Sequence, residues 1–124
     1  MSSPAKCILL VGHCNVDGPR LQKVLGHEFK QARIERINSQ ADLERAVSAG
    51  ADLLLINREP VGFAIEGMQI IRDLQQMRPQ AKVMLISDFP EAQAQALLAG
   101  ALQGFGKSQL GTQAIKELVA AALE

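Results

Sequence analysis

The sequence feature that most constrains the fold is an unbroken run of four large apolar residues, Leu53-Leu54-Leu55-Ile56, which stops at the polar residue Asn57. The run is too short to span a membrane, and it lacks the alternation of a strand with one solvated face. Such a run is typical of a central strand in a parallel sheet, because both faces of that strand are covered. Ligands of open parallel sheets bind beyond the carboxyl ends of the strands, so Asn57 lies where a functional site is expected.

Strand-like segments recur along the chain at regular intervals. Cys7–Val11 is a second apolar run that ends in a turn-prone break, and Lys82–Ser87 repeats the pattern with a hydroxyl at its end. Residues 32–37 alternate apolar and charged side chains, which is typical of a strand nearer a sheet edge. A short strand is predicted near residues 103–106. Together with the Leu53–Asn57 run, these segments predict five strands.

Helical patterns fill the intervals between the strands. Five helices are predicted: from Asp17-Gly18-Pro19 to a stop at Gly26, over residues 41–49 with a stop at Gly50, from Ile65 until Pro79, from Pro90 to Ala99, and from Thr112 onward. Strands and helices that alternate through short loops predict a parallel sheet with right-handed crossovers and helices on both faces. The predicted fold class is α/β, a flavodoxin-like doubly wound (βα)5 unit with strand order 2-1-3-4-5, formed as a single domain by residues 1–124.

Composition argues against several functions. Thirteen basic and thirteen acidic residues cancel, and the aromatic residues are four Phe without Trp or Tyr, so neither a nucleic-acid footprint nor a base-stacking platform is predicted. Met1 to Lys6 lacks the apolar segment of a signal peptide, and no apolar run is long enough to span a membrane. We therefore expect a cytoplasmic protein without a membrane partner, in which Cys7 and Cys14 are reduced thiols.

Four segments in order resemble the CheY-like receiver domain of two-component response regulators, and the resemblance covers almost the whole chain. They are Cys7–Val11, Asp52–Asn57, Val83–Ser87, and Ala99-Gly100-Ala101 followed by Lys107. The resemblance implies a signalling module of a phosphorelay-type system.

The departures from the family pattern concern the residues that carry its chemistry. The resemblance implies two acidic residues that hold Mg²⁺ and a phospho-accepting Asp, but these positions are Gly12, His13 and Asn57. Mg²⁺ prefers carboxylate oxygens, and an amide offers no ionised nucleophile for an acyl phosphate. Of the family's site, only Ser87 and Lys107 remain. No catalytic residue, bound metal or cofactor is therefore expected.

Several residues near the predicted crevice have more than one interpretation. His13 and Cys14 together suggest a metal or thiol-redox site, or else a hydrogen-bonded His beside a Cys that packs as a small apolar residue. Glu59 and Asp88 are each able to supply one metal ligand or to be solvated in their loops. Lys107 is either an anion-binding residue or a partner of Asn57 or Asp88.

The remaining candidate residues concern partners. His27 is expected at the surface. Gln93 and Gln95 lie on the polar side of an Ala-rich helix, and this helix with the strand containing Phe105 resembles the face through which receivers meet partners or one another. Phe105 is also the counterpart of an aromatic residue that receivers often carry in the fifth strand. A helix of small and amide side chains is equally a good surface helix.

These observations predict a degenerate receiver, a pseudo-receiver that binds partner proteins without being switched by aspartyl phosphorylation. The alternative is a small-ligand module that binds an anion or nucleotide at the Gly12 to Asp17 loop. An enzyme is not expected, because no nucleophile and base pair is visible. A homodimer and an output domain beyond Glu124 both remain open.

Overall fold

The computed structural model of the protein describes residues 5–124. The expectation that Met1 to Lys6 is not a signal peptide concerns residues 1–4, which lie outside this range, and the two residues that follow them. In chain order the elements are β1 (Cys7–Val11), α1 (Asp17–Glu28), β2 (Arg33–Ile37), α2 (Gln40–Ala49), β3 (Leu53–Asn57), α3 (Gly67–Met77), β4 (Val83–Ile86), α4 (Pro90–Leu98), β5 (Leu102–Phe105), the 3-10 turn η1 (Lys107–Gln109) and α5 (Gln113–Ala122).

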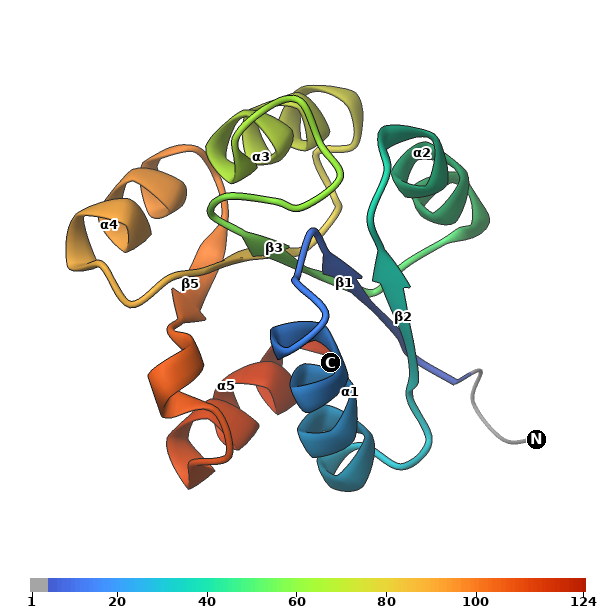
Figure 1. The fold of residues 1–124 in the computed structure, drawn as a ribbon, viewed down its shortest axis with the longest axis vertical. Coiled ribbons are helices and arrows are strands. Elements are labelled where there is room, and N and C mark those ends of the chain that lie inside the picture. The colour runs from blue at the N-terminus through green and yellow to red at the C-terminus, as the bar shows by residue number, and fades with distance from the viewer. Residues whose placement is uncertain (1–4) are drawn as a thin grey trace.

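The five strands form one parallel sheet in the order β2-β1-β3-β4-β5, as predicted. Helices α1 and α5 cover one face, and α2, α3 and α4 cover the other (Figure 1). Two apolar clusters result, one on each side of the sheet. The unbroken apolar runs of β1, β3 and β4 are explained by this arrangement, because successive side chains of a strand point into opposite clusters and both are dry.

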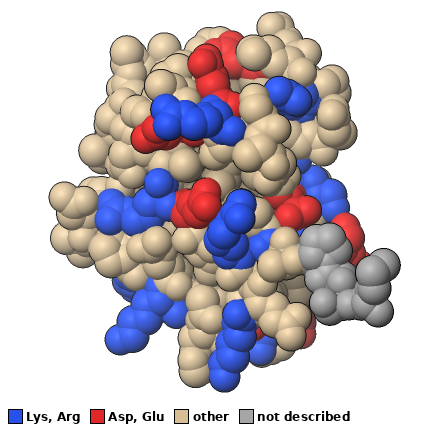
Figure 2. Space-filling view, turned by 90° about the vertical axis from the view of Figure 1, so that its right-hand side faces the viewer, with Lys and Arg blue, Asp and Glu red and all other residues tan. Residues whose placement is uncertain are grey.

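Strand β2 lies at the edge of the sheet, where its alternating sequence predicted it. Arg33 and Glu35 form an ion pair with a distance of 3.0 Å between Nε and Oε1, and both remain substantially exposed. On this side of the molecule, basic and acidic side chains are interspersed without a large area of one sign (Figure 2). Charged side chains on an edge strand oppose pairing with a second sheet.

Two helix boundaries differ from the sequence prediction by about two residues each. Gly26 does not stop the first helix, because α1 continues to Glu28. Gly26 costs about 1 kcal/mol relative to Ala within a helix, but Phe29 at the C-cap is partly buried against the apolar cluster beneath α1 and α5, which favours the extra turn. Helix α3 begins at Gly67, so Ile65 precedes it and is 38% exposed. None of the helices within residues 5–124 is long and apolar enough to cross a membrane.

Candidate functional site

The candidate site lies at the carboxyl edge of the sheet, where β1, β3 and β4 end side by side. The strand registers pair Val11 with Ile56 and Asn57 with Ile86. This pairing brings together the predicted positions Gly12, Asn57 and Ser87. Lys107 follows β5 and lines the same opening, a cavity of about 300 Å³ between the β3 and β4 ends.

Asn57 is used as a hydrogen-bond donor. Its Nδ2 donates to the carbonyl oxygens of Gly12 at 2.9 Å and Glu59 at 3.1 Å. Because both partners are acceptors, the orientation of the amide is fixed by its surroundings. A carboxylate, which only accepts, is unable to make either bond. Asn57 thus joins the end of β1 to the loop after β3.

His13 is fully buried and faces the sheet. Its Nε2 donates to the carbonyl of Leu55 at 2.9 Å, and Nδ1 has no hydrogen-bond partner within the described chain. Burial lowers the pKa of His13 from 6.5 to about 4, although the bond to Leu55 favours the protonated ring. The ring is therefore neutral at physiological pH. This hydrogen-bonded arrangement is one of the two interpretations open for His13.

The thiol of Cys14 belongs to the start of α1. Its Sγ accepts from the backbone N–H of Asp17 at 3.3 Å and lies 3.4 Å from the Asp17 carboxylate. Across residues 5–124, no three His, Cys, Asp or Glu side chains are grouped so that they could hold a metal ion. His13 and Cys14 have separate partners, which gives no support to a shared metal site.

Lys107 pairs with Asp17, which corrects the two partners suggested from sequence, Asn57 and Asp88. Lys107 Nζ lies 2.7 Å from Asp17 Oδ2, with about a quarter to a third of each side chain exposed. The hydrogen bond from Lys107 lowers the pKa of the Asp17 carboxyl below its usual range. The pair connects α1 to the turn after β5. The sequence predicts Asp17 at a helix start and at the end of the alternative ligand loop, and no local pattern signals a contact across 90 residues.

Other polar groups of the crevice loops also have partners. Asp88 accepts a short hydrogen bond from the Ser108 hydroxyl, and Ser87 Oγ accepts from the Phe89 N–H at 3.2 Å. Glu59 pairs with Arg58 at 3.2 Å, and the Arg58 guanidinium lies 4.9 Å from the centroid of the Phe89 ring. Both acids line the opening, but within residues 5–124 neither belongs to a group of three ligand-type side chains that could hold a metal ion.

The loop between β3 and α3 folds back over the end of β1, which the sequence did not predict. Val61 N–H donates to the Gly12 carbonyl at 2.8 Å, and Asn38 Nδ2 donates to the carbonyls of His13 and Val61 at 3.1 and 3.3 Å. Gly12 has a φ of 75°, and a Cβ built there would come within 2.2 Å of the buried Pro60. The place of the family's first acidic side chain is thus filled by Pro60.

Mg²⁺, which the fold implies, does not fit these residues. Gly12 has no side chain, His13 faces Leu55, and Asn57 presents its donors to two carbonyls. A hard cation needs oxygen ligands. The two carboxylates that line this opening, Glu59 and Asp88, are already paired with Arg58 and Ser108.

The start of α1 is equally unsuited to an anion. Two N–H groups of its first turn donate to Cys14, the Asp17 N–H to the sulfur and the Gly18 N–H to the carbonyl. The Asp17 carboxylate lies at the same helix end, where it would repel a second negative charge. The side chain of Arg36 also closes over this loop, with Nη2 donating to the carbonyls of His13 and Cys14 at 3.3 Å.

The predicted partner face requires correction at two residues. Phe105 is 1% exposed and belongs to the apolar cluster beneath α1 and α5. Gln93 turns inward: its Nε2 donates to the carbonyls of Leu85 and Ser87, and its Oε1 accepts from the Gly104 N–H. Gln95 is exposed as expected, and so is His27.

A β-bulge explains why Gln93 is needed inside. The register advances two residues along β4, from Met84 to Ile86, while β5 advances three, from Leu102 to Phe105. Such a bulge leaves ladder groups unpaired. Gln93 supplies partners for two of them, the Leu85 carbonyl and the Gly104 N–H. A side chain on Gly104 would collide with that same carbonyl, because its Cβ would lie 2.1 Å away.

Comparisons with known proteins agree on the fold. No family model matches the sequence, and no curated protein matches it. Among solved structures, the signal receiver domain of an HD domain-containing protein from Pseudomonas fluorescens Pf-5 is similar with a TM-score of 0.81 at 18% identity, over 99% of this chain and 90% of that one. A CheY-like response regulator receiver domain protein from Methanospirillum hungatei JF-1 gives 0.77 at 20% identity, over 96% and 94%.

A third structure, HP1043, described as an orphan response regulator of H. pylori, gives a TM-score of 0.71 at 22% identity, over 99% of this chain and all of that one. At such identities the similarity establishes the fold. The chain has the CheY-like fold of response regulator receiver domains.

Proposed function

We propose that the protein is an atypical receiver, a response-regulator-like module that acts through protein contacts and is not switched by aspartyl phosphorylation. The observation that carries the proposal is the hydrogen bonding of Asn57, whose amide donates to two carbonyls at the position of the phospho-acceptor. Phosphoryl transfer in receivers needs a carboxylate nucleophile and a cation that neutralises the developing charge. Asn57 is not such a nucleophile, and the residues beside it do not suit the cation.

Lys107 gives independent support. In a working phosphoacceptor site this Lys would contact the phosphoryl group, but here its ammonium is 2.7 Å from Asp17. The ion pair connects α1 to the turn after β5 without any ligand. The Lys107 ammonium is therefore already paired with a carboxylate of this chain, so it is not free for a phosphoryl group.

Exposed apolar side chains on and beside α4 support a function in protein binding. Phe89 is 56% exposed, Leu97 45%, Leu98 89% and Leu102 39%. Residues 89–102, which include helix α4, thus carry four of the eight exposed large apolar side chains within residues 5–124, and exposed apolar area is typical of interaction sites. We propose that protein partners in a cytoplasmic signalling pathway contact this surface, on which Gln95 also lies.

The test is the intact mass of the protein after incubation with acetyl phosphate and Mg²⁺, beside a receiver that has all three acidic residues. The expected result is phosphorylation of the control and no added mass on this protein. A hydroxylamine-sensitive adduct of one phosphoryl group on this chain would refute the proposal.

A further inference from the structure

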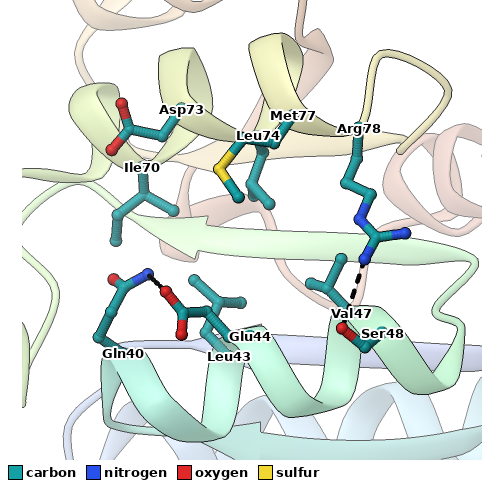
Figure 3. A pocket seen from close by; sticks show the side chains of 10 residues that line it. All are labelled: Gln40, Leu43, Glu44, Val47, Ser48, Ile70, Asp73, Leu74, Met77 and Arg78. Carbon is teal, nitrogen blue, oxygen red and sulfur yellow. Dashed lines mark hydrogen bonds between the residues drawn. The ribbon is translucent and has the colours of Figure 1, made fainter.

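A groove between α2 and α3 lies away from the carboxyl edge of the sheet and has no part in the proposed function above. Its floor is apolar, formed by Leu43 and Val47 of α2 and by Ile70 and Leu74 of α3, and Met77 overhangs it (Figure 3). Leu43, Ile70 and Leu74 are each less than 10% exposed, whereas Met77 is 71% exposed. The flexible, exposed side chain of Met77 thus borders an apolar groove that is already formed.

The two ends of the groove differ in their polar groups. At one end, Arg78 Nη2 donates to Ser48 Oγ at 3.3 Å, and this bond bridges the two helices (Figure 3). Toward the other end lie the carboxylates of Glu44 and Asp73. Within residues 5–124, neither carboxylate forms an ion pair; they accept only from the neutral amides of Gln40 and Gln69.

The size of the groove indicates its occupant. The cavity has a volume of about 80 Å³. Pockets for drug-sized ligands are about 300–1,000 Å³, so a cofactor or nucleotide is too large. One aliphatic side chain suits both the volume and the apolar floor. Two carboxylates without a cationic partner at the open end complement a positive charge beside that side chain.

We propose that the α2–α3 groove binds a partner protein through one Leu, Ile or Met side chain adjacent to a Lys or Arg that pairs with Glu44 and Asp73. A second copy of this chain fits less well. Its exposed Met77 lies beside Arg78, but that guanidinium already donates to Ser48 of the same chain. Its most exposed large apolar residue is Leu98, and residues 91–106 around it include no Lys or Arg.

The probe is a synthetic helical peptide with one Leu and two Lys residues one turn away, titrated into the full-length ¹⁵N-labelled protein. Saturable amide shifts are expected at Leu43, Val47 and Leu74. The same peptide with Ala in place of Leu is expected to bind about tenfold more weakly, because the buried aliphatic surface is lost. A peptide with Glu in place of both Lys residues is expected to leave these amides unshifted.

Protein variants test the same contacts from the other side. We expect the double substitution Glu44→Lys and Asp73→Lys to weaken binding of the Lys-containing peptide at least fivefold. The single substitution Met77→Glu is expected to weaken that binding by at least the same factor. The matched control is Glu117→Lys, because Glu117 on α5 accepts from a Gln one turn earlier as Glu44 does, and it should bind normally. Circular dichroism checks that each variant is folded; Met77 is exposed enough that its substitution leaves the core intact.

Three results would overturn the proposal. The first is the absence of saturable shifts at the groove. The second is equal binding of the peptides with Leu and Ala, which would show nonspecific attraction. The third is a shift of these same amides on dilution without peptide, which would assign the groove to a second copy.

Discussion

Substituting Asn57 by Asp restores the residue type that a phosphorylated receiver has at this position, yet we expect it to damage this protein. In the structure, Asn57 Nδ2 donates to the carbonyls of Gly12 and Glu59. The introduced carboxylate would face both oxygens without a proton to donate. The end of β1 and the loop after β3 would then keep the hydrogen bond from the Val61 N–H to the Gly12 carbonyl but lose the one from Asn57.

The size of the effect follows from the two bonds. Each is worth about 1 kcal/mol, somewhat less for the exposed one to Glu59, and a carboxylate held against carbonyl oxygens adds about 1 kcal/mol. We expect a loss of about 2–3 kcal/mol at pH 7. With an unfolding entropy of about 0.26 kcal/mol/K for 124 residues, the Tm falls by roughly 8–12 °C.

The pH dependence identifies the cause. An Asp facing two acceptors has a folded-state pKa above the ordinary value of about 3.9, so its penalty is full well above that pH and is relieved as protonation allows one hydrogen bond. Urea unfolding of Asn57→Asp should therefore approach that of the wild type as the pH falls from 7 to 4. Asn57→Ala loses the same bonds without a charge, and its difference from wild type should not vary with pH. An Asn57→Asp protein as stable as wild type at pH 7 would refute the reasoning.

Three further substitutions test other contacts of the site. His13 has a folded-state pKa of about 4 against 6.5 when unfolded, so between these values the unfolded chain binds one more proton than the folded chain. The free energy of unfolding therefore falls by about 3 kcal/mol from pH 6.5 to 4. His13→Gln should flatten that part of the plot of stability against pH, and an unchanged slope would count against a buried neutral His. Asp17 has a lowered pKa, so its pairing stabilises the fold above pH 3.8 and is lost as the pH falls through the lowered folded-state pKa. Lys107→Met should cost about 1 kcal/mol at pH 7 and progressively less as the pH falls below 3.8. A loss that does not change with pH would exclude the ion pair as the cause. Gln93→Met should cost about 2 kcal/mol in urea unfolding because it leaves bulge groups unpaired, whereas a change below about 0.5 kcal/mol is what a surface position would give.

The fold could be predicted because the apolar pattern of each strand reports its burial. The runs in β1, β3 and β4 are buried on both faces, and the alternating β2 lies at the edge, as their sequences indicated. The predicted helix end at Gly26 is wrong because tertiary packing of Phe29, just past the helix, outweighs local propensity.

The site was predicted in position but not in its contacts. The registers do bring Gly12, Asn57 and Ser87 to one edge. The Lys107 to Asp17 pair and the cover of Pro60 over Gly12 are contacts between residues about 50 to 90 positions apart, and no periodicity encodes them. The prediction for Phe105 rests on the resemblance to the partner face of receivers, and it is wrong because the ring is buried in the apolar cluster beneath α1 and α5.

The central claim is that this sheet edge no longer accepts a metal-bound phosphoryl group. The most direct measurement is an NMR titration of the ¹⁵N-labelled protein with millimolar Mg²⁺ and beryllofluoride, a phosphoryl analogue. We predict no saturable shift of the Gly12, Asn57, Ser87 and Lys107 amides. Saturable shifts of these amides that require both Mg²⁺ and beryllofluoride would contradict the account.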